Sequence, residues 1–231
     1  MNTSLTMKVL SGALLALATC VTHADAVPNN SIYAGAYFLS FKPTSPGLQG
    51  PFTVPGLNAS VDNVTTTYLA YIRRLSPNFD LELAAGIPPT TTVVGQGPAS
   101  VGSVPYNGQK LITAKWLSPT LLLNYKFFSE DTALRPYVGI GINHTIFYDR
   151  TVTAAGQAVT GGPTSVSLSP STGGAAVVGL SYRLQDRWFA HASYSVSNIH
   201  TSAVADTAGI VRTTHLDFGP RSVVLAVGYT F

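Results

Sequence analysis

Charged residues are scarce in this sequence. They make up only 10% of its 231 residues, whereas a soluble globular protein carries about 25%. Since a water-soluble domain covers most of its surface with charged side chains, the composition argues against an ordinary cytosolic enzyme. The 13 basic and 10 acidic residues are scattered, apart from the pair Arg73 and Arg74, and no stripe of aromatic and basic side chains accompanies them. The sequence therefore does not support nucleic-acid binding.

Long apolar runs are also absent, apart from a short one in an N-terminal segment that is typical of a secretory signal. This segment has a basic residue at Lys8, an apolar run over residues 9–22 and small residues at Ala24 and Ala26. The run is shorter than the roughly 18 to 20 residues that a membrane-spanning helix needs, which disfavours a retained anchor. We expect cleavage after Ala24 or Ala26.

Cysteine is missing from the rest of the chain, because the single cysteine, Cys20, lies within this segment. We expect residues 1–26 to be a signal peptide and residues 27–231 to form a single domain. That domain can form no disulfide, no cysteine-ligated metal site and no thiol nucleophile. A lipoprotein signal with a lipidated Cys20 is an alternative, but Thr19 precedes it where that pattern prefers glycine, alanine or serine.

What the sequence does contain is apolar residues at every second position, the period of a β-strand. In residues 79–87, Phe79, Leu81 and Leu83 share one face while Asp80 and Glu82 take the other. The same alternation occurs in residues 31–42, 65–74, 120–128, 136–147, 175–183, 188–197 and 222–231. The sequence thus predicts about eight strands of about ten residues, the length of a tilted transmembrane strand.

The connections between these strands alternate strictly between short and long. The short, polar ones are residues 74–78, 129–134 and 184–187, and the long ones, rich in Gly, Pro, Ser and Thr, are residues 43–63, 88–119, 148–174 and 198–220. This rhythm predicts an all-β fold, an eight-stranded antiparallel transmembrane β-barrel with short periplasmic turns and long extracellular loops. A secreted β-sandwich or lipocalin-like barrel shows the same alternation. Its outer face would be charged, however, whereas here the second face carries mainly small residues that suit a narrow lumen.

Aromatic residues near the strand ends fit the two interfacial girdles of such a barrel. They are Tyr33, Phe41, Phe79, Tyr125, Phe127, Trp188, Tyr194, Tyr229 and Phe231. The last of them closes the segment Leu225-Ala-Val-Gly-Tyr-Thr-Phe231, which resembles the signal by which assembly machinery recognises bacterial outer-membrane barrels. We expect Phe231 to mediate that contact.

Three segments resemble the OmpW family: residues 79–88, 117–127 and 134–149. The run Arg135-Pro-Tyr-Val-Gly-x-Gly-x-Asn143 is the most specific, and the resemblance covers essentially the whole mature chain. It implies an eight-stranded barrel in the outer membrane of a Gram-negative bacterium, surrounded by membrane lipid and lipopolysaccharide. It also implies a narrow, largely apolar passage that admits small hydrophobic molecules and releases them sideways into the membrane, without cofactor, metal or catalysis.

The passage itself has to be narrow on physical grounds. The interior of an eight-stranded barrel holds only side chains or one slim ligand, so an open water-filled pore is excluded. Apolar residues in the long connections are candidates for lining the passage, among them Leu57, Leu111 and Trp116. No individual gate residue is carried over from the family.

The few polar residues on the strands are candidates for the barrel interior. Those expected to face the lumen are Arg73, Asp80, Glu82, Lys126, Tyr137, Asn143, Arg183 and His191. Asp80 and Glu82 point the same way, so a selectivity ring or a glycosidase-like carboxylate pair is one interpretation. The favoured interpretation is an ionic plug, with Lys126 and Arg73 as partners, because barrel interiors routinely contain paired charges.

Two alternatives to transport stay open. The pair His191 and Ser193 suggests a lipid A hydrolase, in which a serine nucleophile needs a base and an orienting acid. Both residues should point into the barrel, however, and no glutamate follows Glu130. The other alternative is a structural or surface-interaction barrel.

His144, His200 and His215 share no metal-ligand spacing.

Overall fold

The computed structural model describes residues 29–231, except residues 55 and 102. The predicted signal peptide and its cleavage site lie outside the described residues. Within the described part of the chain, no helix combines the length and the hydropathy that crossing a membrane requires.

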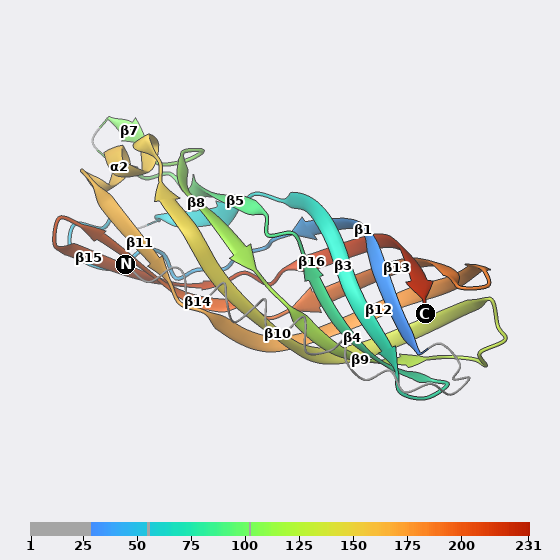
Figure 1. Cartoon of the computed structure of the whole chain (residues 1–231). Coiled ribbons are helices and arrows are strands. Elements are labelled where there is room, and N and C mark those ends of the chain that lie inside the picture. Colours follow the sequence, from blue (N-terminus) through green and yellow to red (C-terminus); the bar gives the residue numbers. More distant parts are fainter. Residues whose placement is uncertain (1–28, 55, 102) are drawn as a thin grey trace.

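Eight antiparallel strands close into a barrel (Figure 1). Their bounds are β1 Asn30–Ser40, β3 Val64–Arg74, β4 Phe79–Gly86, β9 Thr120–Lys126, β10 Leu134–Val152, β12 Ser171–Gln185, β13 Trp188–Ser197 and β16 Arg221–Thr230. The order around the wall is β12-β13-β16-β1-β3-β4-β9-β10, and β10 pairs back onto β12 over Leu134–Thr145. The eight-stranded antiparallel barrel that the sequence predicted is confirmed.

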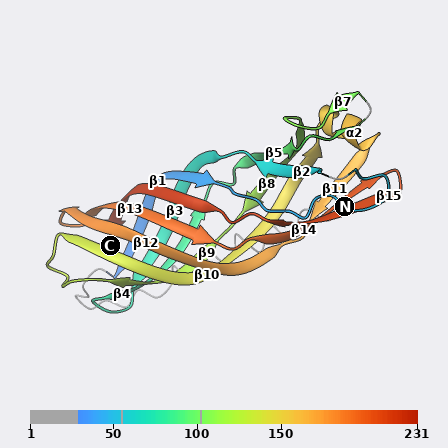
Figure 2. The same cartoon turned by 180° about the vertical axis from the view of Figure 1, so that it is seen from behind.

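The two ends of the barrel differ. At the turn end, where β1 begins and β16 ends, neighbouring strands are joined by short turns such as residues 75–78. At the loop end, the long connections carry further elements (Figure 2). These are β2 Asn58–Val61, β5 Thr90–Gln96, β6 Ser100–Val101, β7 Val104–Pro105, β8 Lys110–Leu117, α2 Ala154–Thr160, β11 Thr164–Leu168, β14 His200–Thr207 and β15 Ile210–Asp217.

The long connections are therefore more regular than their glycine and proline content suggested. Strand β10 continues beyond the barrel, where β8 pairs with it, and β5 and β2 follow. Strands β11, β14 and β15 form a second sheet. Since an extended edge offers a row of unpaired N–H and C=O groups, short β-prone runs pair with it despite the turn residues around them.

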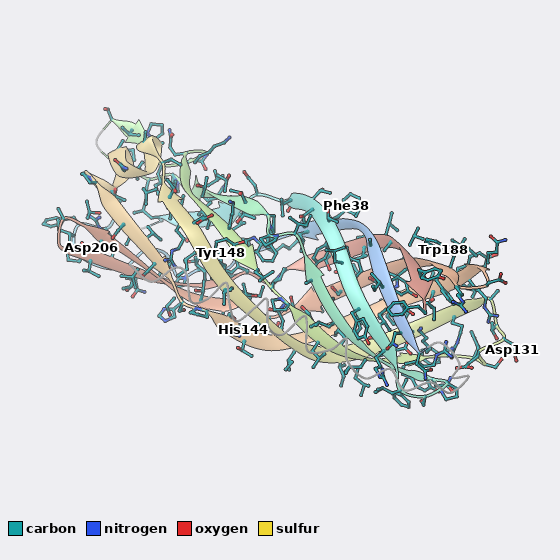
Figure 3. The ribbon with its side chains drawn as sticks, viewed as in Figure 1. Phe38, Asp131, His144, Tyr148, Trp188 and Asp206 are labelled. Carbon is teal, nitrogen blue, oxygen red and sulfur yellow. The ribbon has the colours of Figure 1, made fainter. Side chains whose placement is uncertain are left out.

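The barrel wall separates apolar from polar and small side chains with the predicted period of two. In β16, Leu225 and Val227 are exposed while Val224 and Ala226 are buried. Figure 3 shows Phe38 and Trp188 on the outside of the wall, and both are exposed. The outer surface is thus the apolar one, as a lipid-facing wall requires.

Two of the predicted girdle aromatics lie inside the barrel instead. Tyr33 is only 3% exposed and belongs to a buried cluster with Tyr68 and Val224, and Phe41 packs edge-to-face on Trp116. Strand β1 has large apolar residues on both faces, so its residue types alone did not fix which face points inward.

Glycines on the neighbouring strands make room for the inner aromatic rings. A Cβ at Gly228 would lie 2.5 Å from the ring of Tyr33, and one at Gly179 would lie 2.4 Å from the ring of Tyr137. Such distances are far inside van der Waals contact. Two large rings of the lumen, those of Tyr33 and Tyr137, are therefore packed against positions without a side chain on another strand.

We expect Gly179→Ala to lower the free energy of unfolding by about 1 to 3 kcal/mol, because the added methyl group overpacks the lumen against Tyr137. Gly174→Ala is the matched control on the same strand, since nothing lies within 4 Å of its Cβ position. Urea unfolding in lipid vesicles, followed by the heat-dependent shift in electrophoretic mobility, measures both. Equal effects of the two substitutions would contradict this account.

Candidate functional site

The middle of the lumen is filled by aromatic rings around His191. Its ring centroid lies 5.2 Å from that of Tyr33, 6.1 Å from Tyr68 and 5.7 Å from Tyr137. The Oη of Tyr137 is 3.2 Å from Nε2 of His191, and all four side chains are buried. This aromatic plug occupies the interior as expected for a barrel of this size. It also places His191 away from the lipid-facing surface where a lipid A hydrolase would act.

Two buried carboxylates accompany the plug, and each has its own partner. The Oδ2 of Asp80 lies 2.5 Å from Nζ of Lys126. Glu82 accepts hydrogen bonds from Oη of Tyr68 and from Nδ2 of Asn124, both at 2.6 Å. Both carboxylates are 3% exposed. Separate partners for the two carboxylates are the geometry of an ionic plug. Among the residues described, no group of three or more His, Cys, Asp and Glu could hold a metal ion.

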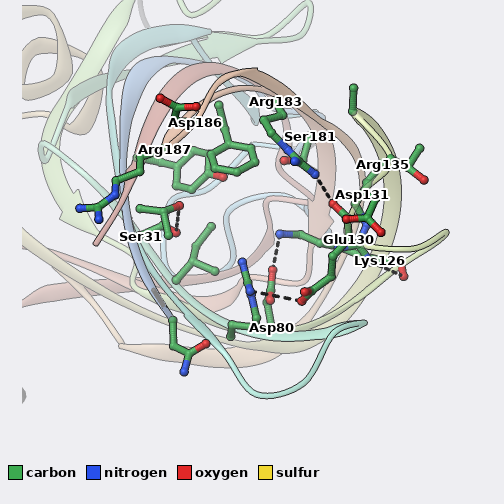
Figure 4. Close-up of a pocket in the computed structure, with 18 residues that line it drawn as sticks. Ser31, Asp80, Lys126, Glu130, Asp131, Arg135, Ser181, Arg183, Asp186 and Arg187 are labelled. Carbon is green, nitrogen blue, oxygen red and sulfur yellow. Dashed lines mark hydrogen bonds and ion pairs between the residues drawn. The ribbon is translucent and has the colours of Figure 1, made fainter. Parts of the chain in front are cut away.

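The turn end of the lumen is a charged mouth around a cavity of about 280 Å³. Figure 4 shows Asp80, Lys126, Glu130 and Arg183 pointing into it. Arg74 Nη1 lies 3.2 Å from a carboxylate oxygen of Glu130, and Arg183 donates to the backbone carbonyl of Glu130. The mouth is thus held by paired charges.

The prediction for Arg73 was wrong, because this side chain is exposed on the outer face of β3. It donates to Oδ1 of Asn30 at the rim. Its neighbour Arg74 is the one that lines the mouth. The reason is the period of two: Ala70 and Ile72 point inward, so the next inward position is 74.

Asn143, on β10, lies nearer the loop end of the lumen. Its side chain holds the segment that joins β8 to β9. Its Nδ2 donates to Oγ of Ser118 at 2.6 Å and to Oγ1 of Thr120 at 2.8 Å. Its Oδ1 accepts from Oγ1 of Thr145 at 2.8 Å. Asn143 is buried, so these bonds replace the hydrogen bonds that it would make to water.

The same segment borders a break in the wall. The ladder between β4 and β9 ends at the pair Ala84–Thr120, and the ladder between β5 and β8 begins at Thr90–Lys115. Within the described residues, no pairing joins 85–89 to 116–119. Three of these positions, Pro88, Pro89 and Pro119, are prolines, which lack the N–H that a ladder needs.

Above the break, the loop end encloses an apolar cavity of about 470 Å³. Its wall includes the buried cluster of Leu57, Tyr106, Leu111 and Val159, and Leu216 and Phe218 also line it. Burial raises the pKa of Tyr106 to about 12, as a poorly hydrated wall would. The volume lies within the range of small-molecule sites.

The three residues proposed for the apolar passage do not all meet in this cavity. Leu57 and Leu111 line it, whereas Trp116 is not among its lining residues. Trp116 is buried at the level of the wall break, with its ring centroid 6.0 Å from that of Phe41. Since β8 is extended, five residues place Leu111 and Trp116 roughly 17 Å apart along the strand.

Sequence reasoning missed one charged residue of this cavity. Arg212, on β15, lines it and is only 7% exposed. Its burial depends on contacts with Pro51 and Thr160, which lie far away in the chain. No local pattern around Arg212 marks it as buried.

We expect Asp80→Asn to lower the free energy of unfolding by about 2 kcal/mol or more, because Lys126 loses its buried partner. The double variant Asp80→Asn/Lys126→Met should recover part of this loss. Lys115→Met is the matched control, since it breaks an exposed ion pair with Asp149, a change of at most about 1 kcal/mol. Urea unfolding in vesicles measures all three, and a loss for Asp80→Asn no larger than for the control would refute the paired-plug description.

Comparison with known proteins places this barrel among bacterial outer-membrane proteins. The OmpW family model matches residues 48–231. Outer membrane protein W of Vibrio cholerae is 32% identical over 154 residues, 67% of this chain and 68% of that protein. The crystal structure of OprG from Pseudomonas aeruginosa superposes with a TM-score of 0.78 at 25% identity, covering 88% of this chain and 96% of that one. The solution structure of E. coli outer membrane protein W gives a TM-score of 0.56 at 25% identity, covering 90% and 100%. This chain belongs to the OmpW family, and its barrel lies in the outer membrane.

Proposed function

We propose that this protein facilitates the passive passage of small hydrophobic molecules across the outer membrane, without cofactor or catalysis. The observation that carries the proposal is the apolar cavity at the loop end, the extracellular end in such barrels. All four long connections contribute to it, through residues such as Leu57, Leu111, Val159 and Leu216. The polar lipopolysaccharide surface hinders the entry of an apolar solute. Transfer of that solute from water into such a cavity is favourable, because its apolar surface is removed from water.

The lumen below the cavity favours a sideways route for the solute. Phe218 lines the cavity and packs in a cluster with Ile199 and Leu216. The aromatic plug and the buried carboxylates lie further toward the turn end. An apolar solute gains nothing by entering that polar region. We infer that it leaves through the wall break between residues 85–89 and 116–119, where Trp116 supplies an apolar inner surface.

The packed lumen also favours a second candidate, a barrel that serves structure or surface contacts and moves no solute. The aromatic plug around His191 and the paired charges below it would suit that role equally well. The two candidates differ only in whether the apolar cavity and the wall break are used. Uptake measurements therefore separate them.

The C-terminal strand supports a further part of the proposal, the contact with assembly machinery. Leu225, Val227, Tyr229 and Phe231 alternate along the exposed face of the last strand and its end. The backbone N–H of Phe231 donates to the carbonyl of Asn30 at 2.8 Å. We infer that the assembly machinery recognises this exposed apolar face before β16 pairs with β1 and closes the barrel.

We expect intact cells that make this protein to take up radiolabelled naphthalene several-fold faster than cells that lack it. Leu111→Lys places a positive charge in the cavity and Trp116→Lys places one at the wall break, and each should return uptake to the level without protein, because an unpaired charge is costly in an apolar site. Val211→Lys is the matched control, since Val211 is exposed on β15. Its uptake should equal that of the unmodified protein.

Surface amounts of all variants are compared by the mobility shift of folded barrels in electrophoresis. Uptake that does not depend on the protein would overturn transport and leave the structural candidate. Uptake that depends on the protein but is unchanged in both lysine variants, Leu111→Lys and Trp116→Lys, would overturn the route through the cavity and the break.

A further inference from the structure

The apolar cavity contains a buried cation. Arg212 lines the cavity from β15 and is 7% exposed. Its Nε donates to the carbonyl of Pro51 at 3.0 Å, and its Nη1 donates to Oγ1 of Thr207 at 3.3 Å and to the carbonyl of Thr160 at 3.4 Å. These three acceptors are neutral oxygens, so they orient the guanidinium without balancing its charge.

No carboxylate of the described residues lies within 4.0 Å of this guanidinium. The two acidic residues nearest in sequence, Asp217 and Asp206, are both exposed. Asp217 pairs with His200, and Asp206 accepts a hydrogen bond from the backbone N–H of Gly209 at 2.8 Å. The remaining nitrogen, Nη2, makes no hydrogen bond to the described part of the chain. A buried charge without a counter-ion is unfavourable, and a bound anion would remove that penalty.

We propose that the cavity binds an amphiphile with one carboxylate and an apolar chain, of the class of medium-chain fatty acids. The carboxylate pairs with Arg212, whose planar guanidinium matches the geometry of a carboxylate. The chain lies against Leu57, Leu111 and Val159 on the apolar wall. The proposal rests on the proposed function of the cavity and adds a head-group preference to it.

A purely structural Arg212 would behave differently. Its three neutral acceptors come from the first, third and fourth long connections, so the side chain also ties the loop end together. Removing those ties would weaken the binding of every ligand to the same degree. Only a direct contact with the head group makes the loss depend on whether the ligand carries a charge.

The test compares decanoate with decanol, which share a ten-carbon chain and differ in the head group. Binding of each radiolabelled compound to the whole barrel in lipid nanodiscs is measured by equilibrium dialysis at pH 7.5, with empty nanodiscs subtracted. We expect Arg212→Gln to weaken decanoate binding about tenfold, the value of one charge-assisted hydrogen bond. Decanol binding should weaken by no more than about twofold, since its hydroxyl carries no charge to pair with the guanidinium and it is affected only by the loss of the loop ties.

Two further variants complete the design. Arg212→Lys keeps the charge and should retain a preference for decanoate, and it also serves if the glutamine variant does not fold. Arg150→Gln removes an exposed arginine on β10 and should leave both affinities unchanged. Folding of each variant is checked by the electrophoretic mobility shift.

Equal weakening of both ligands by Arg212→Gln, or equal affinity of the unmodified protein for the two, would overturn the head-group preference and leave the cavity as a site for apolar solutes. Binding of neither ligand to the unmodified protein would overturn the proposed function of the cavity, and the head-group preference with it.

Discussion

Closure of the strand ladder is the constraint on which the rest of this molecule depends. Inside a membrane every backbone N–H and C=O needs a partner, and a sheet meets this requirement only when its last strand returns to its first. Here β10 pairs with β12 and β1 with β16, so eight strands leave an interior that side chains can fill. The pairing of inner tyrosines with Gly179 and Gly228, and the partners of Asp80 and Glu82, follow from that narrowness.

The hydrogen-bonded strand ladder is interrupted at three prolines, between the barrel and its loop end. Pro88, Pro89 and Pro119 cannot donate hydrogen bonds to a neighbouring strand, and Asn143 holds the adjoining segment through side-chain bonds to Ser118 and Thr120 instead. Above this level the four long connections enclose an apolar cavity. A barrel that is closed and packed below therefore has its available space and its interrupted wall together, near one end.

The two ends also differ in how charge is handled. In the lumen, Asp80 and Lys126 neutralise each other, and Arg74 pairs with Glu130 at the mouth. In the cavity at the loop end, the hydrogen bonds that Arg212 donates within the described residues go to neutral oxygens. A paired charge is already neutralised within the barrel, whereas a charge without a counter-ion next to an apolar cavity indicates a ligand that brings the opposite charge.

Much of the fold was predictable because a barrel wall has two chemically distinct faces, and alternation along each strand reports them directly. The strand count, the rhythm of short and long connections and the inward position of Asp80 and Glu82 follow from that alternation. From the sequence, Arg73 was placed in the lumen instead of Arg74. The two arginines are adjacent at a strand end, and an error of one residue in the alternation reverses the face of the sheet. The inward position of Tyr33, the separation of Trp116 from the cavity and the burial of Arg212 depend on the space and the partners that distant segments provide. The sequence by itself determined a lipid-facing barrel of this family, and only the tertiary structure decided which side chains meet inside it, since those contacts join residues that no local period relates.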